Sequence, residues 1–229
     1  MAQWSFSQAD GDFVPDASGH GYDAHIYGRP HLVPRWGKGQ ALDFDGTGNN
    51  DFWRGGVQDC GLGIGKRLNR AFTKLSVEAW IRKTPAWWMS VVYRDKWDDP
   101  SGFGLATEWS SGKVVFGHYD AGIGHKSGVQ SETTVQDGRW HHVVGTMQAA
   151  AGQGYLYRIY VDGQLDAEQT GTWAVEEAPP EGGILKIAYP NCSGADRPYR
   201  GALDSVAIFD VALTPAQVKG RFEASRERR

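Results

Sequence analysis

Three stretches near the C-terminus decide the fold: RWHHVVGT at residues 139–146, YVDG at residues 160–163 and GALDSVAIFDVALTPAQ at residues 201–217. The first is typical of a β-strand. The second predicts a hairpin, because the Asp162-Gly163 pair favours a two-residue turn with positive φ. The third predicts a last strand that carries one acid, Asp204, and then a helix.

The helix is expected to begin after Thr214. Thr214 can cap it, Pro215 suits the first helical position, and Gln217 completes a capping box. Leu213 and Val218 are spaced as a hydrophobic staple. We therefore expect a short terminal helix that docks on a sheet.

The rest of the chain alternates short apolar runs with Gly, Asp, Asn and Pro clusters, which is typical of an antiparallel sandwich or barrel. In residues 72–82, positions 75, 77, 79 and 81 form an apolar face and positions 76, 78, 80 and 82 a polar face that includes a tryptophan. These patterns predict one all-β domain over residues 1–229, an antiparallel sandwich or barrel. The expected strands are 3–7, 24–28, 41–44, 72–82, 89–95, 103–107, 113–118, 140–147, 155–161, 164–170, 184–188 and 202–209.

Composition limits the partners. The chain has 24 basic and 27 acidic residues, a net charge of −3, so nucleic acid is not an expected partner. No apolar run approaches the ~18 residues of a membrane span. No signal peptide is visible. We expect a secreted or cell-surface module of a longer chain, whose other domains are possible partners.

The two cysteines, Cys60 and Cys192, both fall in glycine-rich loops. They form a disulfide if the loops meet, which implies an oxidising compartment. The alternative is two unpaired thiols.

Seven motifs occur in an order that resembles laminin-G-like domains, members of the concanavalin A-like lectin/glucanase superfamily. They are WSF at 4–6, PDASGHG at 15–21, GQALDFDG at 39–46, FTKLSVEAWIR at 72–82, WHHV at 140–143, YVDG at 160–163 and GALD at 201–204. The resemblance implies a jelly roll whose first and last strands are neighbours. Residues 49–68 depart from it, being longer and richer in Gly and Trp. Ligand preference is expected in such loops.

A structural calcium ion is one expectation. Asp16 lies in a Gly/Ser turn with His20, and the alternation places Asp204 on the apolar face of Val206 and Ile208, where an acid needs a partner. Calcium takes carboxylate and carbonyl oxygens. The resemblance implies that Asp16 and Asp204 meet. Alternatively, Asp204 accepts backbone N–H groups or pairs with an arginine such as Arg200.

A glycan-binding site is a second expectation, because sugars bind to aromatic platforms flanked by polar groups. Trp97 follows Tyr93, Arg94 and Asp95 in a charged segment. The other candidates near strand ends are Trp109, His118 and Asn191. The alternative is that most of these aromatic side chains fill the core.

Two further motifs predict structure rather than chemistry. His141 and His142 are adjacent on a strand, so their rings point to opposite faces and cannot readily share a metal ion. The pair Asp10 and Asp12 lacks the later glycine and glutamate of an EF-hand loop.

Catalysis has little support in the sequence. A retaining glycosidase needs two carboxylates about 5–5.5 Å apart, and no strand carries such a pair. The sequence favours a non-catalytic module over an enzyme. Three functions remain: a carbohydrate-binding module with structural calcium, a polysaccharide-cleaving enzyme of the same fold, and a protein-interaction or adhesion module.

Overall fold

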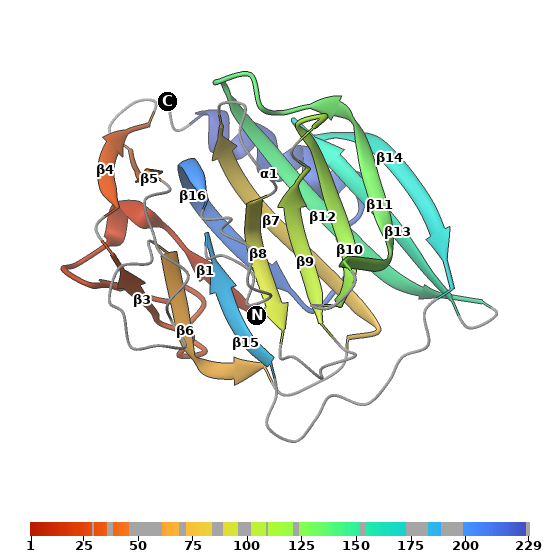
Figure 1. Ribbon diagram of the computed structural model, residues 1–229, viewed down its shortest axis with the longest axis horizontal. Helices are drawn as coiled ribbons and strands as arrows, with labels where there is room; N and C mark the ends of the chain where they lie inside the picture. The colour runs from red at the N-terminus through yellow and green to blue at the C-terminus, as the bar shows by residue number, and fades with distance from the viewer. Residues whose placement is uncertain are drawn as a thin grey trace.

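The computed structural model describes residues 1–28, 30–35, 39–45, 61–68, 72–83, 89–95, 102–108, 110–120, 124–151, 154–172, 183–188 and 199–227. Within these ranges the strands form two antiparallel sheets of eight strands each, which confirms the all-β sandwich. Figure 1 is seen from the side of the second sheet, with the C-terminal α-helix behind the first. No described helix is long and apolar enough to cross a membrane.

The first sheet, sheet A, contains the closing strand of the chain at its centre. Its order is β14-β13-β12-β7-β16-β5-β4, and β1 also pairs with β16. Their bounds are β14 Gln164–Gly171, β13 Gly154–Val161, β12 Trp140–Ala150, β7 Lys74–Arg82, β16 Arg200–Phe209, β5 Gln40–Asp45, β4 His31–Pro34 and β1 Ala2–Trp4.

The second sheet, sheet B, has the order β11-β10-β9-β8-β15-β6-β3-β2. Its strands are β11 Gly124–Thr134, β10 Lys113–Asp120, β9 Phe103–Thr107, β8 Met89–Asp95, β15 Gly183–Ile187, β6 Gly61–Leu68, β3 Ala24–Tyr27 and β2 Phe13–Val14. A 3-10 helix, η1 at Phe6–Gln8, follows β1.

The core lies between the sheets. A Cβ atom added at Gly145 of β12 would stand 2.2 Å from the Phe116 ring of β10, so the phenyl ring of one sheet packs directly against the backbone of the other. Fully buried aliphatic side chains fill the same layer, among them Val77, Val143, Leu105 and Leu185. The apolar face expected in residues 72–82 is therefore the inner face of sheet A.

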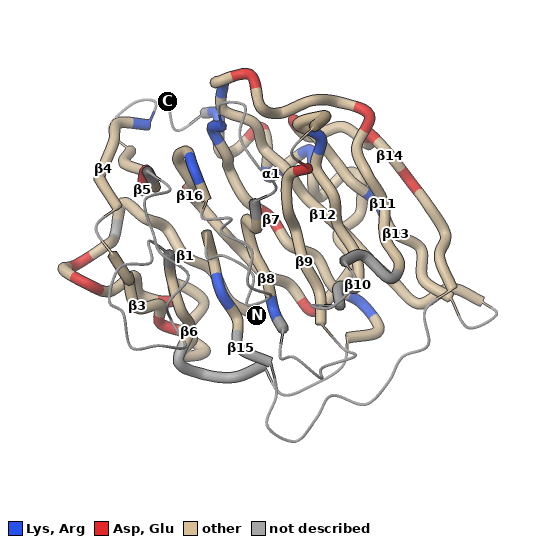
Figure 2. The backbone as a smooth tube through the Cα atoms, in the orientation of Figure 1, with Lys and Arg blue, Asp and Glu red and all other residues tan. Residues whose placement is uncertain are grey.

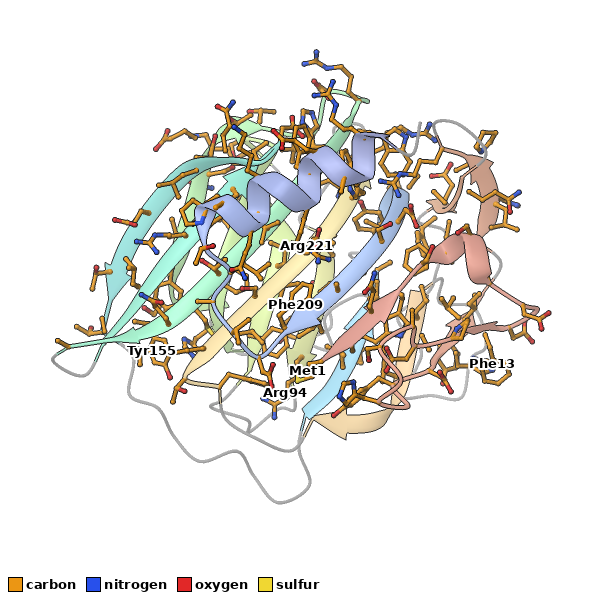
Figure 3. The ribbon with its side chains drawn as sticks, turned by 180° about the vertical axis from the view of Figure 1, so that it is seen from behind. Met1, Phe13, Arg94, Tyr155, Phe209 and Arg221 are labelled. Carbon is orange, nitrogen blue, oxygen red and sulfur yellow. The ribbon has the colours of Figure 1, made fainter. Side chains whose placement is uncertain are left out.

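The polar face of β7 is covered by the helix α1, Pro215–Glu227, as Figure 3 shows from behind. Trp80 of β7 stacks on Phe222 of α1, with ring centroids 5.8 Å apart. Reciprocal bonds between Thr214 and Gln217 form the expected capping box at its start. Leu213 and Val218 share a small buried cluster, which confirms the staple.

The hairpin between β13 and β14 is also confirmed, because Asp162 and Gly163 have φ values of 51° and 80°. Four strands were not expected from the sequence: β2, β4, β6 and β11. Two of them, β2 and β4, are short edge strands. In β6, Gly61, Gly63 and Gly65 occupy every second position, so one face lacks the side chains on which an alternation signal depends.

The prediction that Asp204 shares the apolar face of Val206 and Ile208 is wrong. Ser205 has a φ of 50°, and the register of β16 against β7 shifts between Asp204 and Ala207. This bulge turns Asp204 to the outer face, where it pairs across with Trp80, while Val206 and Ile208 stay in the core. The sequence did not reveal the extra residue.

The buried carboxylate of Asp204 is held by an arginine and a backbone group. It forms an ion pair with Arg35, the residue after β4, and accepts the N–H of Phe6 at 3.2 Å. The Arg35 guanidinium also lies over the Trp80 ring, 4.9 Å from its centroid. The expected alternative to calcium is thus observed for Asp204, with Arg35 rather than Arg200 as the partner.

The adjacent histidines have the separate structural roles expected for them. His141 lies between two carboxylates, 2.9 Å from Asp162 and 3.1 Å from Asp137. His142 lies on the other face, 2.8 Å from Glu78, which also pairs with Arg221 of α1 at 2.6 Å. The hydrogen bond and charge of Asp162, with Asp137, outweigh burial and raise the pKa of His141.

Replacing Asp204 with Asn should destabilise the protein by about 3 kcal/mol, because it leaves the Arg35 charge buried without its counter-ion. Urea unfolding measures the change. Glu223→Gln, on the exposed side of α1, is the control and should change the free energy of unfolding by less than about 0.5 kcal/mol. A loss below about 1 kcal/mol for Asp204→Asn would contradict the role of the pair.

The His141 contacts should stabilise the fold most between about pH 4 and pH 6.5. A raised histidine pKa gives stability that is present below the usual 6.5 and is lost as the pH rises through the folded value. Burial raises the pKa of Asp137 and Asp162, but hydrogen bonds outweigh it and lower both below the usual 3.8, so their contribution is lost in acid. His141→Gln should therefore cost more free energy of unfolding at pH 5.5 than at pH 8.5. An equal cost at the two pH values would refute this assignment.

Candidate functional site

Three aromatic rings line the outer face of sheet B at its β2 edge. Phe13 and His25 are direct cross-strand partners, and their ring centroids lie 4.9 Å apart in an edge-to-face arrangement. Tyr27 follows two positions after His25 on the same face of β3, with ring centroids 4.7 Å apart. Ala24 and Ile26, between them, point into the core. We call Phe13, His25 and Tyr27 the aromatic strip.

A glycine on the next strand leaves room for the strip. Gly63 of β6 is the cross-strand partner of His25. A Cβ atom at position 63 would stand 2.8 Å from Cε2 of Tyr27, so the tyrosine ring lies directly on the bare backbone. The position of the Tyr27 ring therefore depends on the absence of a side chain at Gly63.

The strip is accessible at both ends. Phe13 is 55% exposed and Tyr27 is 39% exposed. In the described part of the chain, these are the only aromatic residues among the large hydrophobic side chains that are exposed. Figure 3 shows Phe13 at the periphery of the molecule. Nδ1 of His25 is buried and has no hydrogen-bond partner in the described structure, so ring contacts hold the imidazole.

A tight turn places a carboxylate beside the strip. Asp10 and Phe13 exchange both backbone hydrogen bonds, at 2.9 and 3.1 Å, across a turn whose first residue, Gly11, has a φ of 56°. Residues paired in this way have neighbouring side chains on one face. Asp10 and Asp12 are both exposed, and the turn that carries them projects at the left edge of Figure 2.

Exposed rings in a row can stack on flat apolar surfaces, and the exposed carboxylates can accept hydrogen bonds from hydroxyl or ammonium groups. Across the sheet the row continues from Gly63 to Lys186 of β15, which is buried. This arrangement suits binding. No pair of groups in it forms a nucleophile with a base.

The predicted glycan residues that the structure describes, Tyr93, Arg94 and His118, do not share an exposed face. Tyr93 pairs with Lys186 on the outer side of sheet B but is only 2% exposed. Arg94 points inward, fully buried, with its guanidinium 5.9 Å from the Phe72 ring centroid. His118 is also buried and lies 2.7 Å from the Tyr157 hydroxyl. Arg94 and His118 therefore present no surface to a ligand.

Burial lowers the pKa of His118 to about 4, so its imidazole is neutral near neutral pH. The remaining predicted ligand residues, Trp97, Trp109 and Asn191, lie outside the described residues, as does the side chain of Asp95. Cys60 and Cys192 lie outside them too. The disulfide stays a prediction.

Two of the predicted calcium ligands meet through a serine. The Ser18 hydroxyl lies 2.8 Å from the Asp16 carboxylate and 3.0 Å from Nδ1 of His20. The Asp16 carboxylate also accepts the backbone N–H groups of Gln3, Ser18 and Tyr22. Burial raises the pKa of Asp16, but these hydrogen bonds outweigh it and hold the pKa below its usual value.

The carboxylates of Asp16 and Asp204 are not free to coordinate a calcium ion in this arrangement. The two Asp16 oxygens already accept four hydrogen bonds, and the Asp204 carboxylate is paired with a guanidinium. Calcium needs 6–8 oxygen ligands. Among the described residues there is no group of three or more His, Cys, Asp or Glu side chains that could hold a metal ion.

The described carboxyl groups do not favour acid catalysis either. In Asp16, Glu78, Glu108, Asp137 and Asp162, hydrogen bonds outweigh the effect of burial and lower the pKa of the carboxyl group, to about 2 for Glu108 and Asp137. A general acid for glycoside cleavage needs a raised pKa.

The aromatic strip was missed in the sequence, although part of its signal was present. His25 and Tyr27 alternate with Ala24 and Ile26 in the expected strand 24–28, which places two rings on one face. The Asp10-Gly11 pair signals a turn before Phe13. The sequence prediction did not include β2, because a strand of two residues is too short to show an alternation.

Curated relatives match short parts of long proteins. The Sushi, von Willebrand factor type A, EGF and pentraxin domain-containing protein 1 of Rattus norvegicus is 28% identical over 102 residues, which is 42% of this chain and 3% of that protein. The Mus musculus protein of the same name is 27% identical over 127 residues, or 53% of this chain and 3% of that protein. The chain thus spans a small fraction of the length of these relatives.

Solved structures share the fold at low identity. The binding domain of Paraclostridial Mosquitocidal Protein 1 has a TM-score of 0.69 at 13% identity and covers 98% of this chain and 52% of its own. Domain 4 of AbnA, an extracellular arabinanase from Geobacillus stearothermophilus solved with arabinotriose, has a TM-score of 0.64 at 17% identity, with 96% of each chain covered. Trypanosoma rangeli sialidase in complex with sialic acid has a TM-score of 0.65 at 16% identity, covering 99% of this chain and 33% of its own.

The family assignment rests on a sequence model rather than on these structural neighbours. The model of the concanavalin A-like lectin/glucanases superfamily, in its laminin-G form, matches residues 62–219, well over half of the chain. The resemblance seen in the sequence is confirmed, and the chain belongs to the laminin-G-like members of the concanavalin A-like lectin/glucanases superfamily.

Proposed function

We propose that this protein is a non-catalytic carbohydrate-binding module and that the aromatic strip is its binding surface. The observation that carries the proposal is the row of Phe13, His25 and Tyr27 on the outer face of sheet B, with its two end rings exposed. A contiguous row of exposed aromatic rings is typical of an interaction surface. Equilibrium binding, with no bond made or broken, is the whole mechanism.

A saccharide suits the strip better than a compact ligand does. The planes of the Phe13 and Tyr27 rings are inclined to that of His25 by 83° and 45°, so the strip is not a single flat platform, and an extended chain can place different sugar units on its two exposed end rings. The exposed Asp10 and Asp12 carboxylates can accept hydrogen bonds from its hydroxyl groups. Domain 4 of AbnA, with which this chain shares its fold, was solved with arabinotriose.

A protein-interaction module is the second candidate, because exposed aromatic residues also anchor protein interfaces. Retention on immobilised polysaccharides distinguishes the two. A polysaccharide-cleaving enzyme is the third, and product analysis after incubation with mixed polysaccharides tests it. A secreted or cell-surface location and attachment to other domains remain proposals that fit multivalent, individually weak glycan binding.

Removing the rings of the strip should weaken glycan binding. Phe13→Ala and Tyr27→Ala should each raise the Kd for a retained polysaccharide about tenfold, because each deletes a stacking surface. Gly63→Val should have a similar effect although it removes no ring, because the valine side chain displaces the ring of Tyr27. Affinity electrophoresis in polysaccharide gels gives the Kd values.

Leu165→Ala is the matched control, since Leu165 is 50% exposed on β14, in the other sheet. Its mobility in the gels should equal that of the wild-type protein. Glycan binding that survives all three strip substitutions would place the site elsewhere, and retention by no polysaccharide would favour the protein-interaction module.

The structural calcium ion stays a proposal from the sequence, with Asp16 and His20 as its remaining candidate ligands. If an ion binds there, the Ser18 hydroxyl must turn away from Asp16 to release a carboxylate oxygen. Added calcium should then raise the melting temperature, and Asp16→Asn should abolish the rise. Equal melting temperatures with calcium and with a chelator would show that the protein has no structural calcium ion.

A further inference from the structure

We propose that the strip prefers glycans with free amino groups, and that the corner formed by Asp10 and Phe13 binds the ammonium group of an amino sugar. This inference rests on the proposed glycan-binding function and names the class of ligand. It follows from the position of one exposed carboxylate at the end of the aromatic row.

Backbone pairing fixes the position of Asp10 next to Phe13. Asp10 and Phe13 exchange both backbone hydrogen bonds, so their Cβ atoms lie about 5 Å apart on one face. Phe13 is in turn the cross-strand partner of His25. A sugar stacked on Phe13 therefore has a carboxylate at its rim.

Among the described residues, the charge of this corner is negative. Asp10 and Asp12 are exposed, and neither has an ion pair with a described residue. Asp23, directly before β3, adds a third carboxylate that accepts the N–H of Asp16 at 2.8 Å. The described cation in the same row, Lys186, is only 4% exposed.

An ammonium group gains from both neighbours. It pairs with the Asp10 carboxylate, and it is attracted by the face of the Phe13 ring. An N-acetylated sugar keeps the stacking and loses the charge. A uronic acid brings a like charge toward Asp10 and Asp12, which opposes binding. We expect the order of affinity to be amino sugar, then N-acetylated or neutral sugar, then acidic sugar.

Titration calorimetry with three oligosaccharides of equal length tests the proposal: a glucosamine tetramer, its fully N-acetylated form and a galacturonic acid tetramer. At about pH 6 and low salt, the wild-type protein should bind the glucosamine tetramer about three- to tenfold more tightly than the acetylated one. Asp10→Asn should remove the difference and leave the affinity for the acetylated tetramer unchanged.

Two controls separate this contact from general electrostatics. Glu223→Gln removes an exposed carboxylate on α1, behind the other sheet, and should keep the preference. Phe13→Ala should weaken the binding of both the glucosamine and the acetylated tetramer.

The outcomes distinguish this inference from the function on which it rests. If the acetylated tetramer binds as tightly as the glucosamine tetramer, or if Asp10→Asn keeps the preference, the ammonium site is refuted while glycan binding stands. If the glucosamine tetramer binds and Phe13→Ala leaves its affinity unchanged, the site lies elsewhere and the inference fails. Binding of neither these tetramers nor any neutral polysaccharide would overturn both proposals.

Discussion

The buried ion pair of Asp204 and Arg35 fixes the point where the closing strand changes neighbours. β16 pairs with β5 up to Leu203 and with β1 from Val206 onward, and the bulge at Ser205 separates the two registers. At this junction the Phe6 N–H falls outside the ladder, and the Asp204 carboxylate accepts it. An uncharged side chain at position 204 could accept the N–H but could not neutralise Arg35. The carboxylate of Asp204 therefore links three segments: the N-terminal segment at Phe6, the end of β4 at Arg35, and the closing strand β16.

The candidate site depends on that junction through the N-terminal segment. β1 leads to the turn at Asp16, whose carboxylate accepts the N–H of Gln3, and Asp23 accepts the N–H of Asp16 just before β3 begins. These two hydrogen bonds link β1 to the residue that precedes β3, and so they help to fix the position of β3 and of the aromatic strip. The acids that looked like metal ligands in the sequence hold backbone groups in the structure, and the surface they position is aromatic.

Local sequence patterns were sufficient to predict the fold but not the candidate site. The Asp162-Gly163 turn and the cap at Thr214 each encode their structure within a few residues, so both could be predicted. The face of Asp204 could not, because a one-residue bulge inverts the alternation and leaves no mark in residue polarity. The strip could not either, since Phe13 and His25 meet only through the pairing of β2 with β3. The predicted ligands Arg94 and His118 carry polar atoms that fit a sugar site equally well in sequence, yet their strands turn both of them inward.

The most direct measurement of the central claim is backbone amide chemical-shift mapping during a titration with neutral and amino-sugar oligosaccharides. If the strip is the binding surface, the largest shifts fall at residues 10–14, 24–27 and 61–64, and residues 215–227 of α1 on the far side stay unchanged. Saturable shifts centred on other strands, with the strip amides unmoved, would contradict the account.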